Sequence, residues 1–270
     1  MEIFKNIFDL NKAIKKFDNF GFVPTMGGIH KGHISLIKNS QKKCKKTIVS
    51  IFVNPTQFNN KKDFVSYPRN LNKDIKILKK LKIDYLFIPN VKDIYKKKIK
   101  VIKITSLDKV LCAKFRKGHF EGVLNVMNRL LGTIKAKYIF LGEKDFQQLY
   151  LIKKYLSKRH RANIINCKTV RDKNFVALST RNNLLTKKNY LRVVKIVKFL
   201  INLKKKLKFK KQFSKINLKE IMNKIEKFYQ VQIDYLDVRN EKNLKISNTN
   251  KKFRLFVAFK INNVRLIDNF

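Results

Sequence analysis

Short, nearly continuous apolar runs alternate with longer amphipathic stretches along the first 170 residues. The runs contain few polar interruptions, which is typical of strands buried on both faces of a parallel sheet. The stretches between them repeat apolar residues at helical spacing. We therefore predict strands at Gly21–Thr25, Thr47–Val53, Asp84–Pro89 and Tyr138–Leu141. We predict helices at Gly32–Cys44, Leu71–Leu81 and Glu121–Ile134, and another after Lys144.

This alternation predicts an α/β fold with a Rossmann-like parallel sheet and helices on both faces. After about residue 170, two Lys-rich helical stretches precede segments that alternate in polarity, at Val231–Val238, Arg254–Phe259 and Val264–Ile267. That order predicts a smaller α+β C-terminal domain, with domain bounds of 1–169 and 170–270. Parallel sheets bind ligands at the carboxyl ends of their strands, so the chemistry is expected in the loops that follow strands.

The chain has 64 Lys+Arg against 18 Asp+Glu, a formal net charge of +46. Such a charge favours nucleic-acid binding, because it attracts phosphate backbones. However, 53 of the basic residues are Lys, and they are spread evenly along the chain instead of gathering on one segment. Drift toward A/T-rich codons accounts for abundant Lys and Asn. We therefore predict no specific nucleic-acid partner and keep a nucleic-acid-binding protein as the alternative.

Cys44, Cys112 and Cys167 lie far apart without a CxxC pair, which is typical of reduced thiols in a cytosolic protein. The first residues mix charges into an apolar pattern and predict an amphipathic helix, not a signal peptide. No stretch approaches the roughly 20 apolar residues that span a bilayer. We expect a cytoplasmic protein with no membrane partner.

The most informative segment is Gly21–His33, which reads GFVPTMGGIHKGH. Here a predicted strand ends in a Gly-Gly turn, and a predicted helix begins beside His30 and His33. Glycines let a ligand approach the backbone, and a helix N-terminus offers N–H groups to phosphate. Two imidazoles three positions apart face one side of a helix, where they can stabilise phosphate charge. A surface turn with incidental histidines is the less favoured alternative.

Two further polar loops follow predicted strands. Asn54 and Gln57 come after the second strand, and their neutral amides can bind hydroxyl or carboxylate groups. Gly142–Asp145 comes after the fourth strand, where Lys144 can bind phosphate, and Gln148 lies one helical turn beyond it. For each loop alone, a structural polar turn is the alternative.

Two more residues have alternative interpretations. Asp74 is either a magnesium ligand or an exposed carboxylate on the helix Leu71–Leu81. His119 either reaches the site or begins a helix and bonds its own backbone.

The segment from His30 to His33 matches the HxGH signature and resembles the nucleotidyltransferase superfamily, which includes class I aminoacyl-tRNA synthetases. The longer stretch VPTMG-x-x-H-x-GH-x-SL is similar to the pantothenate synthetase (pantoate–β-alanine ligase) family. The blocks IFVNPTQF, YPR, RKGHFEGV, LGEKDFQQL and ALSTRN extend this resemblance over nearly the whole chain. The chain departs from the family pattern at Lys117 in place of Pro, Thr180 in place of Ser, and Lys173-Asn174 in place of Asp-Gly.

The resemblance implies an ATP-dependent ligase that joins pantoate to β-alanine through a pantoyl adenylate, with Mg²⁺ and a homodimer. It implies that residues 1–169 bind ATP and pantoate and that residues 170–270 form a lid. Catalysis is assigned to His33, His30, Lys144 and Arg181. Contacts with pantoate or β-alanine are assigned to Gln57, Gln148 and Asn54. Contacts with ATP are assigned to Met26, Gly27, Gly28, Ile29, His30, Lys31, Gly32, His33, Gly142, Glu143, Lys144, Asp145, Val170, Leu178, Ser179, Thr180 and Arg181.

Overall fold

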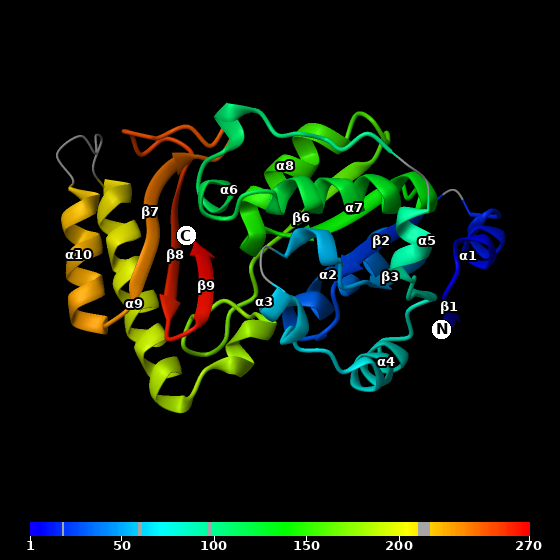
Figure 1. The fold of residues 1–270 in the computed structure, drawn as a ribbon, viewed down its shortest axis with the longest axis horizontal. Helices are drawn as coiled ribbons and strands as arrows, with labels where there is room; N and C mark the ends of the chain where they lie inside the picture. The colour runs from blue at the N-terminus through cyan, green and yellow to red at the C-terminus, as the bar shows by residue number, and fades with distance from the viewer. Residues whose placement is uncertain (18, 59–60, 97–98, 210–216) are drawn as a thin grey trace. The chain divides into compact units, whose positions relative to one another are not determined.

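The computed structural model describes residues 1–270 except 18, 59–60, 97–98 and 210–216 (Figure 1). The chain divides into two compact units, each described by itself below. The first unit comprises Met1–Ser106 and Arg116–Thr169. The second comprises Val170–Phe270 together with the short segment Leu107–Phe115. The apolar pattern gave no indication that this short segment belongs with the second unit.

A six-stranded parallel sheet forms the centre of the first unit. In spatial order its strands are β1 (Glu2–Phe4), β4 (Tyr85–Phe87), β3 (Lys46–Ile51), β2 (Phe20–Thr25), β5 (Tyr138–Gly142) and β6 (Asn163–Cys167). The four predicted strands are the four inner ones, and the predicted fold class is confirmed. The sequence did not predict the two edge strands, which are short and only partly apolar.

Both faces of the sheet are buried, as the continuous apolar runs predicted. Val23 pairs with Val49, which pairs with Leu86, and all three side chains belong to one fully buried cluster. Successive side chains of a strand point to opposite faces. Phe22 and Ile48, each one position earlier, are equally inaccessible and lie on the other face.

The first residues correct one prediction. Instead of a helix from the start of the chain, Glu2–Phe4 pairs with β4, and α1 (Ile7–Ile14) begins only after Asn6. Asn6 accepts a hydrogen bond from the backbone N–H of Asp9, which caps the helix. Pairing with a neighbouring strand thus prevails over the amphipathic pattern in these residues.

The remaining helices of the first unit connect the strands. The longer ones are α2 (Lys31–Lys43), α4 (Leu71–Lys80), α7 (His119–Ile134) and α8 (Phe146–Leu156). The shorter ones are α3 (Lys61–Val65), α5 (Val91–Tyr95), η1 (Pro55–Gln57) and η3 (Glu143–Asp145). In the described part of the chain, no helix has the length and apolar character needed to cross a membrane.

The second unit is built around a three-stranded antiparallel sheet in the order β7 (Gln232–Asn240), β8 (Phe253–Ile261), β9 (Val264–Asn269). Two helices, α9 (Lys187–Phe209) and α10 (Leu218–Tyr229), lie side by side against it (Figure 1). Leu200, Ile225 and Leu255 join helices and sheet in one buried core. The unit also contains α6 (Cys112–Phe115), η4 (Thr180–Leu184) and part of η2 (Ser106–Asp108).

Candidate active site

Three loops leave neighbouring strands at the carboxyl edge of the parallel sheet. They follow β2, β3 and β5, which are adjacent in the sheet order. These are the loops in which the sequence predicted the turn with Gly27 and Gly28, the pair Asn54 and Gln57, and the segment around Lys144. The topology therefore brings the predicted groups of the first unit to one edge.

The turn after β2 is fixed by a buried carboxylate. Gly27 and Gly28 adopt φ of 83° and 64°, a region that suits glycine. The backbone N–H groups of Gly28 and Ile29 each donate to one carboxylate oxygen of Asp74, both over 2.8 Å. Asp74 is only 3% exposed, so it is not the exposed helix carboxylate that was one of its two interpretations. It holds the turn, and both of its oxygens are engaged.

His30 and His33 cap the helix that follows this turn. The Nδ1 of His30 accepts from the N–H of Gly32 over 3.0 Å, and the Nδ1 of His33 accepts from the N–H of His30 over 3.4 Å. A neutral imidazole that accepts at Nδ1 carries its proton on Nε2. The two rings lie 4.1 Å apart between centroids, and each carries its N–H on Nε2.

Both imidazoles are neutral at physiological pH. Burial, with the Lys144 cation nearby, lowers the pKa of His30 to about 4. Burial and then the neighbouring His30 lower the pKa of His33 to about 3. The Asp145 carboxylate opposes both shifts but does not cancel them. The pair therefore donates hydrogen bonds without adding charge.

The loop after β5 contributes the charge of the site. Lys144 and Asp145 act electrostatically on both histidines, and they form an ion pair with each other over 3.3 Å. The Lys144 side chain is 19% exposed and that of Asp145 is 47% exposed. One cation beside two neutral N–H donors is an arrangement that can bind phosphate oxygens.

The turn Asn54–Phe58, here called the amide turn, follows β3. The Nε2 of Gln57 lies 2.7 Å from the sulfur of Met26, which joins this turn to the glycine turn. Asn54 is 1% exposed, and its Nδ2 donates to the side chain of Gln57 over 3.2 Å and to the carbonyl of Gly122 over 3.3 Å. Its Oδ1 accepts from Tyr95 over 2.7 Å and also from Thr56. These bonds use both N–H groups of Asn54, so its expected direct contact with a substrate does not fit this geometry.

Helix α7 packs against the amide turn at very close range. A Cβ built on Gly122 would lie 2.3 Å from the carbonyl oxygen of Thr56, so only glycine allows this approach. At the start of the same helix, the Nδ1 of His119 donates to the carbonyl of Gln57 over 2.7 Å. The Nε2 of His119 faces the guanidinium of Arg116 at 2.8 Å. His119 therefore holds the backbone of the amide turn, which neither of its two interpretations anticipated.

The predicted phosphate loop of the second unit is the segment Val170–Asn182, here called the STRN loop. The N–H of Leu178 donates to the carbonyl of Val170 over 3.0 Å, which closes the loop. Ser179 caps η4, since its hydroxyl accepts from the N–H of Arg181 over 3.3 Å. Thr180 is buried, whereas Ser179 and Arg181 are half-buried.

Hydrogen bonds of Arg171 and Asp172 fix the base of the STRN loop. Arg171 makes a two-pronged ion pair with Asp268 at 2.8 and 2.9 Å, and it also donates to the carbonyl of Asn269. Asp172 accepts from the hydroxyl of Tyr190 over 2.6 Å. The loop is thus tied to both β9 and α9.

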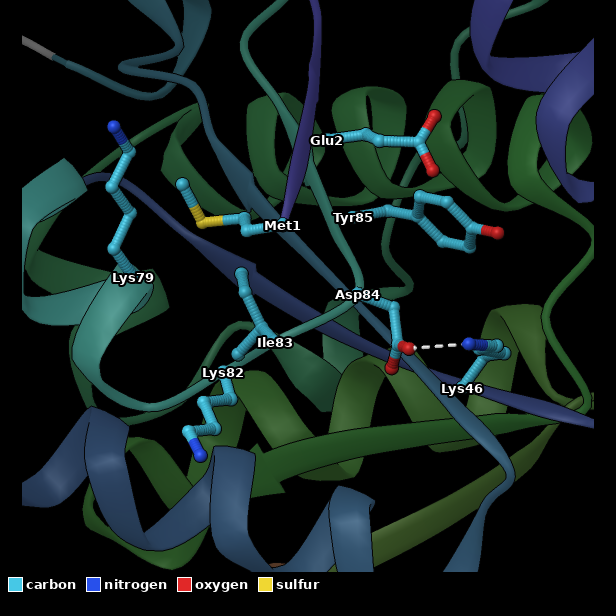
Figure 2. Close-up of a pocket in the computed structure, with 8 residues that line it drawn as sticks. All are labelled: Met1, Glu2, Lys46, Lys79, Lys82, Ile83, Asp84 and Tyr85. Atoms are coloured by element: carbon cyan, nitrogen blue, oxygen red, sulfur yellow. Dashed lines mark hydrogen bonds and ion pairs between the residues drawn. The ribbon is translucent and has the colours of Figure 1, made fainter.

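A cavity of about 310 Å³ lies at the opposite end of the parallel strands (Figure 2). Glu2, Lys46 and Tyr85, each the first residue of its strand, lie along it. Figure 2 shows Lys46 paired with Asp84, a bond of 2.8 Å that raises the pKa of Lys46. This cavity contains none of the residues that the sequence predicted for the site.

Comparisons with known proteins match the chain over nearly its whole length. The family model described as pantoate–β-alanine ligase matches residues 2–270. The pantothenate synthetase of Endomicrobium trichonymphae is 40% identical over 276 residues, which cover 100% of this chain and 97% of that protein.

Two solved structures extend the match to the fold. A pantoate–β-alanine ligase from Francisella tularensis, complexed with β,γ-ATP and β-alanine, superimposes with a TM-score of 0.85 at 40% identity, covering 100% of this chain and 97% of that one. The pantothenate synthetase of Thermus thermophilus gives a TM-score of 0.89 at 27% identity, covering 100% of this chain and 99% of that one.

The chain belongs to the pantoate–β-alanine ligase family. The resemblance expected from the motifs is confirmed, and membership in the family makes the chain a ligase. The structure of this family member brings together His30, His33, Lys144 and Asp145. Gln148 is half-buried in the first turn of α8.

The family resemblance led to the expectation of a magnesium ion. Among the described residues, no group of three His, Cys, Asp or Glu side chains could hold a metal. Both carboxylate oxygens of Asp74, the suggested ligand, accept hydrogen bonds from backbone N–H groups. These residues do not fit a protein-held ion.

Sequence reasoning missed Tyr95 and Arg116, and it assigned no holding role to Asp74 or His119. His119 lies in the block RKGHFEGV, and Asp74 lies five positions after the block YPR, so a signal for both was present in the sequence. Tyr95 lies outside every block, and only its contacts in the structure reveal it.

Proposed function

We propose that this protein condenses (R)-pantoate with β-alanine at the expense of ATP, as a pantothenate synthetase. Family membership over residues 2–270 supports the reaction class. The single observation that carries the proposal is the pair of neutral imidazoles, His30 and His33, beside the Lys144 cation at the carboxyl edge of the sheet. The related Francisella tularensis structure is complexed with β,γ-ATP and β-alanine.

In the first half-reaction, a carboxylate oxygen of pantoate attacks the α-phosphorus of ATP. A new P–O bond forms, and the bond between the α-phosphorus and the oxygen that bridges to the β-phosphate breaks. Pyrophosphate leaves with the electron pair of that bond. The Nε2–H groups of His30 and His33 would donate to the phosphate oxygens, and Lys144 would neutralise the charge that develops. Gln57 and Gln148 would hold pantoate.

In the second half-reaction, the neutral amine of β-alanine attacks the acyl carbon of the pantoyl adenylate. The C–N bond forms, AMP leaves with its oxygen, and the amine proton passes to solvent. Positioning accounts for both steps, because the adenylate is already activated. The mechanism therefore assigns no nucleophile to the protein, and Cys44, Cys112 and Cys167 are all buried.

The STRN loop would bind the triphosphate through Ser179, Thr180 and Arg181, with Val170 and Leu178 beside the nucleotide. The remaining ATP contacts would come from Met26–Gly32 and Gly142–Asp145. We propose that residues 170–270 act as a lid that protects the adenylate from water. The hydroxyl of Ser179 and the guanidinium of Arg181 are donors of the kind that phosphate requires.

We further propose that Mg²⁺ arrives bound to ATP. Magnesium usually retains several water ligands and binds the phosphate groups of a substrate. Light scattering would test the expected homodimer. A cytoplasmic location agrees with three free cysteines.

The assay separates the two half-reactions. With ATP and pantoate, the purified protein should release pyrophosphate, and AMP should form only when β-alanine is added. AMP formation with nicotinamide mononucleotide, or with an amino acid and tRNA, but not with pantoate, would assign the chain to another branch of the superfamily.

A further inference from the structure

The amide of Gln57 has a fixed orientation that originates outside the residues assigned to the substrates. Its Oε1 accepts from Asn54, and its Nε2 donates to the sulfur of Met26. Among the residues that the structure describes, one lone pair of Oε1 and one N–H of Nε2 remain for a ligand. Which of these two faces a ligand depends on the orientation of Asn54.

Asn54 is oriented by contacts on both ends of its own amide. Its Nδ2 faces two acceptors, the side chain of Gln57 and the carbonyl of Gly122. If the side-chain amide of Asn54 were flipped, its oxygen would face these two acceptors and both hydrogen bonds would be lost. On the other end, the shortest of its bonds comes from the hydroxyl of Tyr95, over 2.7 Å.

Tyr95 is itself held by several contacts at the end of α5. Its hydroxyl also lies 2.9 Å from the hydroxyl of Thr56. The guanidinium of Arg129 lies 4.7 Å from the centroid of its ring, and Arg129 donates to the neighbouring carbonyl of Ile94 over 3.1 Å. Burial raises the pKa of Tyr95, so its hydroxyl keeps its proton at neutral pH.

We propose that Tyr95 is a positioning residue for the organic-acid substrate, acting through Asn54 to fix the donor and acceptor of Gln57. This inference rests on the proposed function. The inference goes beyond the proposed function because Tyr95 lies in none of the sequence blocks and acts on Gln57 through Asn54. A fixed amide binds its ligand without the entropy cost of ordering a mobile side chain.

Tyr95→Phe is the direct test, because it removes the hydroxyl and keeps the ring that Arg129 contacts. Pyrophosphate release should show a KM for pantoate that is raised about fivefold, the equivalent of one hydrogen bond. The KM for ATP and kcat should change by less than a factor of two. Tyr85→Phe, at the opposite end of the strands, is the matched control and should leave all constants unchanged.

A double-mutant cycle separates positioning from general stability. If Tyr95 acts through Gln57, Tyr95→Phe should have no further effect on the KM for pantoate in a Gln57→Ala background. An additive effect, or equal changes in the KM of ATP and pantoate, would overturn the proposal.

Two other outcomes are distinguishable. If Tyr95→Phe does not fold, Thr56→Val removes a donor to the same Asn54 oxygen and should raise the KM for pantoate. An unchanged KM in that variant would also overturn the proposal. A wild-type protein that releases no pyrophosphate with pantoate would refute the proposed function itself, whereas an active wild type with an unaltered Tyr95→Phe variant refutes only the inference.

Discussion

The amide turn of the first unit and the STRN loop of the second unit are held by opposite chemistry. Mostly neutral groups fix the amide turn: the side chains of Asn54 and Tyr95, and the backbone of Gly122. The guanidinium of Arg116 adds a long hydrogen bond of 3.4 Å to the carbonyl of Gln57. Charged groups fix the STRN loop, chiefly the ion pair between Arg171 and Asp268, whose carboxylate side chain is only 6% exposed.

This difference predicts different vulnerabilities. The stability of a neutral hydrogen-bond network depends on geometry, because each donor needs its acceptor at a defined place. It responds little to salt. A buried ion pair has a larger cost when it is broken, since the remaining charge lacks its partner. The amide turn should therefore fail through geometry and the STRN loop through charge.

The largest effect is expected where neutral donors would meet substrate. His33→Ala removes an Nε2–H donor and a helix cap, and pyrophosphate release should fall by about 10²- to 10³-fold, as for other lost oxyanion donors. His33→Gln offers an N–H at similar reach and should recover part of the rate. Single-turnover measurements of pyrophosphate would check both variants. A rate within twofold of the wild type in His33→Ala would refute the assigned role.

The second effect tests geometry directly. Gly122→Ala would place its Cβ 2.3 Å from the carbonyl oxygen of Thr56 and 2.9 Å from the Cα of Gln57. The amide turn must shift, and misplacement of this size should lower kcat/KM for pantoate by about 30-fold.

Helix α7 contains the matched control for this variant. A Cβ on Gly132 would meet His160 only at 3.7 Å, an ordinary contact. Gly132→Ala should therefore keep full activity and stabilise the protein by about 0.5–1 kcal/mol, because alanine favours the helix. Equal activity of the two variants would show that the close approach of α7 has no functional consequence.

These residues also show how far the sequence alone could lead. The apolar runs predicted β2, β3, β4 and β5 because a strand buried on both faces has no polar alternation to obscure it. The edge strands β1 and β6 were missed, since an edge strand is short and partly exposed. The glycine turn was predicted from local pattern, because its glycines and histidines are neighbours in the chain.

Long-range hydrogen bonds are what the sequence could not supply. Asp74 binds backbone groups 45 and 46 positions away, and Tyr95 binds Asn54 from 41 positions away. In the sequence, an Asp within a helical pattern is the same whether its carboxylate faces solvent or binds the backbone of a turn. The interpretations of Asp74 and His119 stayed open for this reason, and each residue proved to hold a backbone.

A third prediction concerns the charged loop. Asp268→Asn leaves Arg171 half-buried without its anion, and the free energy of unfolding should fall by about 3 kcal/mol. Under the proposed function, the KM for ATP should rise about tenfold, whereas the KM for pantoate should stay near that of the wild type. Glu220→Gln breaks an exposed pair with Lys224 in the same unit and should change neither quantity measurably. Chemical denaturation and initial rates would check this prediction, and a shift in pantoate KM alone would contradict it.

The smallest effect comes from the pH dependence of stability. Burial lowers the pKa of His33 to about 3 and that of His30 to about 4, against 6.5 for an ordinary histidine. Below about pH 6.5 the unfolded chain therefore takes up protons that the folded chain refuses, so stability is full above this pH and declines toward the folded pKa values. Between about pH 7 and pH 6, the loss from His33 should be on the order of 0.5 kcal/mol. Denaturation of the wild type and of His33→Gln at both pH values would measure it, because the variant has no group to titrate there. An equal slope in both proteins would mean that folding does not lower the pKa of His33, and the imidazole would then titrate in the folded chain as it does in the unfolded one.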